Sequence, residues 1–158
     1  YLESDVQQDI LKLVVVNRYQ KSTPAVAFIR NIGIQSGAFA STVAHDSHNI
    51  IAVGADDTSI AEAVNALMET KGGLSVVFNG ETDVLPLPLA GLMSLSSCED
   101  VATDYQRLDK KVKNLGCPLR APFMTLSFMA LLVIPELKLS DKGLFDGKQF
   151  RFTGLQGK

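Results

Sequence analysis

The side chains best suited to chemistry in this sequence are concentrated in one short segment. Five consecutive residues combine both histidines of the chain with a carboxylate, a hydroxyl and an amide: His45, Asp46, Ser47, His48 and Asn49. Two imidazoles three residues apart can bind one metal ion if the backbone turns between them, with Asp46 as a third ligand or an orienting group. Apolar segments on both sides predict strands that this stretch connects. We therefore call residues 45–49 the histidine loop.

The same residue types are also common in turns that have no chemical role. Aspartate, serine and asparagine side chains routinely form hydrogen bonds with nearby backbone groups. A Ser-His-Asp hydrolytic site is disfavoured because its groups normally converge from different elements, whereas Ser47 is adjacent to His48 in the sequence. On residue types and spacing alone, a structural role is favoured over a metal site.

Three other segments have structural explanations. Asp56 and Asp57 could bind a cation, but carboxylates also suit the start of a helix. Gly72 and Gly73 follow a predicted helix, whereas phosphate-binding loops precede one and carry a lysine. Residues 85–94, which we call the proline segment, cannot form a central strand because proline has no amide donor. This segment is either a rigid core connection or a contact surface for something outside the domain.

Composition indicates one folded domain. Hydrophobic residues make up 46% and charged residues 20% of the 158 positions, as in ordinary globular domains. The net charge of −2 argues against nucleic acid and anionic membranes as partners. The most apolar run, residues 123–134, is shorter than the roughly 20 residues that span a bilayer, so we expect a buried core segment. Cys98 and Cys117 form no Cys-x-x-Cys pair, and such sparse usage predicts a cytoplasmic protein.

Local patterns predict strands interleaved with helices. Apolar runs predict strands at residues 11–16, 25–34, 38–44, 50–53, 74–78 and 81–85. Helical spacing predicts helices at residues 59–70 and 97–115, the first with a capping box formed by Ser59 and Glu62. Asn79 and Gly80 predict a tight hairpin turn. The expected fold class is α/β: a mixed β-sheet sandwich with packed helices, in a single domain.

Several segments, taken in order, resemble one protein family. They are residues 37–49, Gly54, and residues 63–65, 72–73, 87–94, 122–124, 127–128, 134–135 and 143–144. Motifs in the right order over residues 11–146 are more specific than any one alone. On these segments the sequence resembles the carboxyl-terminal domain of bacterial-type adenine deaminases, in the amidohydrolase superfamily. Leu95, where an acidic residue is expected, and the region of Arg30 and Asn31 depart from the pattern.

The resemblance implies hydrolysis of adenine to hypoxanthine and ammonia, a step of purine metabolism. It also implies a divalent metal, manganese or iron, in an amino-terminal amidohydrolase barrel that precedes this domain and is its partner. Such a barrel needs about 200 residues and several histidines, whereas this chain contains two histidines. We therefore expect an adenine deaminase fragment that binds no metal and is inactive alone, within a homo-oligomer.

With the resemblance added, the histidine loop has two possible roles. In the first, it reaches the barrel mouth, where His45 or His48 exchanges a proton near the purine and Asp46 holds the tautomer. Ser47 and Asn49 would then bind the substrate. In the second, the loop organises this domain or its subunit contacts. We favour the first, because two histidines and an aspartate exceed what a turn requires.

Two further functions remain as alternatives. The chain could be a stand-alone ligand-binding or oligomerisation module, in which the histidine loop holds a small ligand or a metal. It could also be an independent small hydrolase, which would show activity and bound metal in the purified chain.

Overall fold

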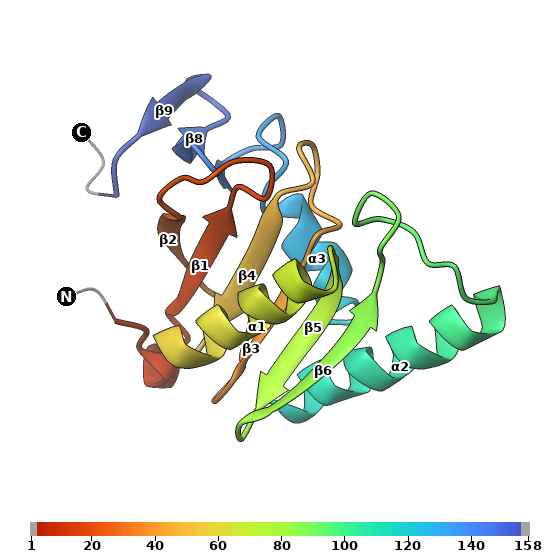
Figure 1. The fold of residues 1–158 in the computed structure, drawn as a ribbon. Helices are drawn as coiled ribbons and strands as arrows, with labels where there is room; N and C mark the ends of the chain where they lie inside the picture. The colour runs from red at the N-terminus through yellow and green to blue at the C-terminus, as the bar shows by residue number, and fades with distance from the viewer. Residues whose placement is uncertain (1–2, 156–158) are drawn as a thin grey trace.

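A six-stranded sheet forms the centre of the molecule. The computed structural model describes residues 3–155, and the strands lie in the order β2-β1-β4-β3-β5-β6, with every neighbouring pair antiparallel (Figure 1). The strands are β1 (Leu11–Val16), β2 (Ala25–Ile29), β3 (Ala38–Ser41), β4 (Ile50–Gly54), β5 (Gly73–Phe78) and β6 (Glu81–Pro86). A smaller antiparallel sheet consists of β7 (Leu137–Ser140), β8 (Gly143–Asp146) and β9 (Arg151–Thr153).

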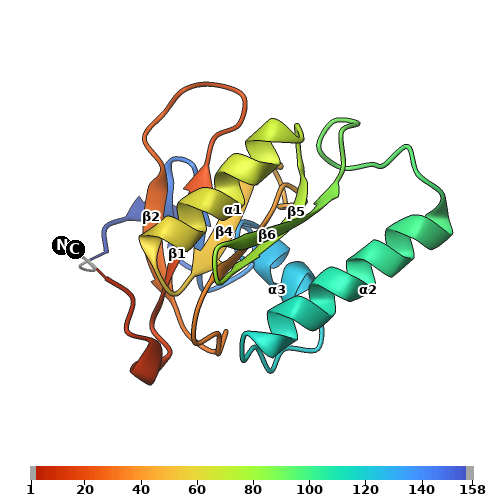
Figure 2. The ribbon, with the colours of Figure 1, turned by 60° about the horizontal axis from the view of Figure 1, so that its bottom comes forward.

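Helices cover both faces of the central sheet. Helix α1 (Asp57–Glu69) lies on one face, while α2 (Cys98–Asn114) and α3 (Pro122–Phe128) lie on the other (Figure 2). The small sheet packs on the same face as α2 and α3, against β1 and β2. A short 3-10 helix, η1 (Val6–Gln8), precedes β1.

Strand alternation produces the two apolar layers of the core. In β4, Ile50 and Ala52 face α1, whereas Ile51 and Val53 face α2 and α3, and all four side chains are buried. Successive side chains of a strand point to opposite faces, so a strand covered on both faces is apolar throughout. This explains why β4 and residues 13–16 of β1 are continuous apolar runs in the sequence.

The strand register brings several loops to one end of the sheet. Val16 pairs with Ile50, Ser41 with Leu74, and Gly73 with Pro86. The segments that follow β1, β3 and β6 therefore all leave the sheet at the same end, which we call the loop end. The histidine loop and the proline segment meet there.

Most local predictions are confirmed, with shifted boundaries. Residues 11–16 form β1 as predicted, and Asn79 and Gly80 form the β5–β6 turn with positive φ angles of 52° and 77°. The first helix begins at Asp57 and is capped by Asp56, which accepts a hydrogen bond from the Ser59 amide, so the predicted capping box is wrong. Asp56 and Asp57 do mark a helix start.

Other predictions need correction. The α/β class is confirmed, but the sheets are wholly antiparallel, not mixed. Strands expected at residues 25–34 and 38–44 end at Ile29 and Ser41. The buried core segment predicted at residues 123–134 is confirmed only in part, because α3 buries Phe123 whereas Val133 is 65% exposed. Within residues 3–155, no helix is long and apolar enough to cross a membrane.

Phe39 in β3 provides a test of the core. Its side chain is fully buried, and its ring meets that of Phe123 edge to face with 5.4 Å between centroids. Phe39→Ala should lower the free energy of unfolding by about 3–5 kcal/mol, measured by urea denaturation. Phe150→Ala removes a ring that is 74% exposed and should cost less than about 1 kcal/mol. Similar losses in the two variants would contradict this assignment of the core.

Candidate functional site

The histidine loop joins β3 to β4 and rests on the end of α3. The His45 amide donates to the Ser127 carbonyl at 3.3 Å, and the His45 ring lies 5.2 Å from the Phe128 ring, between centroids. Asp46 and Ser47 are exposed, His48 is half-buried and Asn49 is buried. The loop therefore has an anchored start and end, with its polar tip open to solvent.

The two imidazoles lie side by side without completing a metal site. Their ring centroids are 6.2 Å apart at an interplanar angle of 69°. Among residues 3–155, no group of three or more His, Cys, Asp or Glu side chains is arranged to hold a metal ion. The Ser47 hydroxyl accepts a hydrogen bond from Asn49 Nδ2 at 3.1 Å, in place of the Ser-His contact that a hydrolytic triad requires.

His48 combines an unusual backbone with an unsatisfied side chain. Its φ angle of 52° lies in the left-handed region, which costs a residue with a Cβ about 1 kcal/mol or more. Its Nδ1 is buried and has no hydrogen-bond partner, alone among side-chain polar atoms in the part of the chain that the structure describes. A buried polar atom left unpaired costs about 1–3 kcal/mol. Local stability therefore does not explain a histidine at this position.

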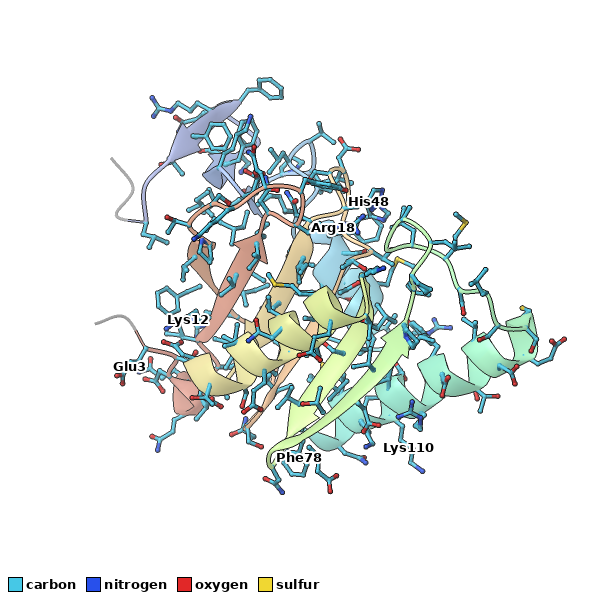
Figure 3. All side chains as sticks on the ribbon, viewed as in Figure 1. Glu3, Lys12, Arg18, His48, Phe78 and Lys110 are labelled. Carbon is cyan, nitrogen blue, oxygen red and sulfur yellow. The ribbon has the colours of Figure 1, made fainter. Side chains whose placement is uncertain are left out.

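Arg18 and Tyr19, which follow β1, hold the histidine loop. Arg18 Nε donates to the His48 carbonyl at 2.7 Å, and the Tyr19 hydroxyl donates to the Ser47 carbonyl at 2.9 Å. The Arg18 amide also donates to Asn49 Oδ1 at 3.4 Å. Figure 3 shows Arg18 and His48 next to each other at the loop end. Sequence reasoning missed both residues, because their contacts join positions about 30 apart in the chain.

The proline segment packs against the same end of the sheet. Leu85 and Leu87 are buried, whereas Met93 is 57% exposed, so the segment is part core connection and part surface. The buried Thr42 hydroxyl donates to the Gly91 carbonyl at 2.6 Å. Arg18 reaches the segment as well, through a hydrogen bond to the Ala90 carbonyl. Arg18 therefore has hydrogen bonds to both the histidine loop and the proline segment.

The fold and the loop end define an α/β domain that presents two imidazoles at one end of an antiparallel sheet. A family model described as "Adenine deaminase C-terminal domain" matches residues 1–151. The chain belongs to this family, as the motifs of residues 37–49 and 87–94 predict.

Curated relatives support the same assignment. The chain is 58% identical to an adenine deaminase of Salinibacter ruber over 97% of its length, and 57% identical to one of Sulfurovum sp. over 96%. It is 50% identical to an adenine deaminase of Parabacteroides distasonis over 98% of its length. In each case the match covers 28% of the relative, so the chain spans little more than a quarter of these proteins.

The backbone of His48 can be tested separately from its ring. His48→Gly and His48→Ala both remove the imidazole, but only alanine keeps a Cβ in the left-handed conformation. The glycine variant should be about 1 kcal/mol more stable than the alanine variant, measured by urea denaturation. An alanine variant as stable as the glycine variant would contradict a left-handed residue 48.

Proposed function

We propose that this chain is the carboxyl-terminal domain of an adenine deaminase, an enzyme that hydrolyses adenine to hypoxanthine and ammonia. Family membership and relatives named adenine deaminase support the proposal. The 28% coverage supports a larger enzyme in which this domain assists. The domain contributes side chains from its loop end, while the centre that activates water lies in the amino-terminal amidohydrolase barrel.

The divalent metal, manganese or iron, belongs to the barrel in this proposal. An amidohydrolase site uses several histidines and an aspartate to bind metal and activate water. This sequence contains two histidines, and residues 3–155 provide no three-ligand cluster. The chain therefore does not fit the metal, and its own residues act on the substrate or on the shape of the pocket.

The unpaired Nδ1 of His48 is the observation that carries the proposed role of the histidine loop. A buried nitrogen without a partner is costly, and such costs are concentrated at functional sites. We infer that His48 exchanges a proton, or forms a hydrogen bond, with a group outside this chain in the assembled enzyme. We propose that His45, whose ring is tilted against that of Phe128, acts beside His48, and that exposed Asp46 orients an imidazole on assembly.

The two polar residues that complete the loop differ in their freedom to reach a substrate. Ser47 is exposed, and we propose that its hydroxyl contacts the purine. Asn49 was also expected to bind substrate, but its two polar atoms contact Arg18 and Ser47 inside the domain. We propose that Asn49 acts by orienting the Ser47 hydroxyl.

We propose that the loop end faces the amino-terminal barrel. Exposed apolar side chains occur beside the histidine loop at Tyr19, and in or next to the proline segment at Leu89, Met93 and Leu95, of which Leu95 is 79% exposed. Apolar side chains gathered beside polar groups are typical of an interface. The part of the relatives beyond this 28% supplies an occupant of sufficient size in the same polypeptide.

Two properties of the whole enzyme complete the proposal. The chain is expected in the cytoplasm because it has two cysteines, both free, one exposed and one buried. The enzyme is expected to be a homo-oligomer, as soluble enzymes with apolar surface segments commonly are.

We expect the imidazole of His48 to be required for turnover in the full-length enzyme. His48→Gly and His48→Ala should both lower kcat for adenine by about 100-fold or more, because positioned proton transfer contributes at least that factor. Asn79→Ala and Asn79→Gly form a matched control, since Asn79 has the same φ angle of 52° at the other end of the sheet. Turnover and the unfolding midpoint are measured together. Unchanged turnover in both His48 variants would remove the proposed role.

We expect the isolated chain to have no deaminase activity of its own. The purified 158-residue chain should release no ammonia from adenine and should bind no stoichiometric metal, while the full-length enzyme does both. The full-length enzyme without this domain should lose most of its turnover. Ammonia release by the isolated chain would support the alternative of an independent hydrolase.

A further inference from the structure

One guanidinium group connects the two segments of the loop end. Arg18 Nε donates to the His48 carbonyl at 2.7 Å, and a second nitrogen of the same group donates to the Ala90 carbonyl. His48 belongs to the histidine loop and Ala90 to the proline segment, 42 positions further along the chain. The planar guanidinium presents its donors in a rigid fork, so it fixes the distance and the angle between the two carbonyls.

Both carbonyls belong to residues with strained backbones. The φ angles of His48 and Ala90 are 52° and 57°, in the left-handed region that side chains with a Cβ rarely adopt. Such conformations persist only where surrounding contacts determine them. Arg18 supplies such a contact to each residue.

Further hydrogen bonds from Arg18 and Tyr19 hold the residues on either side of His48. The Tyr19 hydroxyl accepts a hydrogen bond from Arg18 at 3.2 Å and donates one to the Ser47 carbonyl. The Arg18 amide donates to Asn49 Oδ1. Ser47, His48 and Asn49 are therefore each held by a donor from Arg18 or Tyr19.

Gly91 leaves the space that the guanidinium occupies. A Cβ at this position would lie 2.2 Å from one terminal nitrogen of Arg18, far inside contact distance. Within residues 3–155, Arg18 forms no ion pair, so its donors serve carbonyl and hydroxyl oxygens rather than a carboxylate. The contacts of the Arg18 guanidinium are therefore suited to holding backbone segments in place rather than to neutralising a negative charge.

We propose that Arg18 is a positioning residue, which sets the direction of the His48 imidazole by holding the His48 carbonyl against the proline segment. Its effect on adenine turnover rests on the proposed function of the histidine loop. Its effect on the loop itself does not, because that follows from the hydrogen bonds.

The test uses Arg18→Lys in the full-length enzyme. Lysine keeps the charge, but a single ammonium group cannot reproduce the fork across both carbonyls. Amide hydrogen exchange of residues 45–49 and 87–93 should become at least about 10-fold faster, while exchange in β5 stays unchanged. The kcat for adenine should fall at least about 10-fold, because small misplacements of reacting groups reduce rates strongly. Arg30→Lys is the matched control, since Arg30 contacts the Gln8 carbonyl at the opposite end of the sheet.

Gly91→Ala provides a second variant that leaves Arg18 in place. The added methyl group should displace the guanidinium and accelerate exchange in the histidine loop, although residue 91 lies outside that loop. Gly80→Ala is its control, because Gly80 also has a positive φ angle, of 77°, but a Cβ added there would have no other atom within 4 Å.

Three outcomes distinguish the positioning role of Arg18 from the proposed role of the histidine loop in deamination. Unchanged exchange at residues 45–49 in both Arg18→Lys and Gly91→Ala would overturn the positioning role. Faster exchange with lower kcat supports both the positioning role and the proposed function. Faster exchange with unchanged kcat supports the positioning role and removes the histidine loop from the deamination chemistry.

Discussion

Antiparallel pairing of β1 and β3 on either side of β4 determines which parts of the chain can meet. Val16 lies opposite Ile50, and Ser41 lies opposite Ile51, so the residues that follow β1 and β3 emerge together. A shift of one residue in either pairing would move each side chain of β4 into the opposite apolar layer, where it would no longer fit its packing partners. The core therefore fixes the register, and the register places Arg18 beside the histidine loop.

Hydrogen bonds at the loop end satisfy two carbonyls of the histidine loop and leave one buried side-chain nitrogen unpaired. The carbonyls of Ser47 and His48 each have a donor, whereas His48 Nδ1 has none. The structure thus holds the backbone of His48 in place and leaves the buried nitrogen of its imidazole free. A group held in this way needs little reorganisation when it meets a partner, which is the property that binding and catalytic side chains require.

Residue patterns predicted the individual strands, helices and turns better than they predicted the order and direction of the strands in the sheet. Strands β1 and β4 are valine- and isoleucine-rich, and Asn79 with Gly80 has a strong turn preference, so local sequence was sufficient there. Strand order and direction depend on contacts between distant positions, which periodicity does not encode. The histidine loop was visible because its residue types are reactive. Arg18 was not, because a lone arginine after a strand is ordinary until its carbonyl partners are known.

The left-handed backbone and the unpaired nitrogen at the loop end cost free energy of folding. The domain can tolerate this cost because it is confined to a few residues that a rigid sheet supports. Both faces of β4 are buried, and Thr42 connects β3 to Gly73 and Gly91 through a fully buried hydroxyl. Strained residues persist when their surroundings determine them, and a doubly covered sheet provides such surroundings. The rigid sheet can therefore support both the positive φ angle of His48 and the unpaired nitrogen on the same residue.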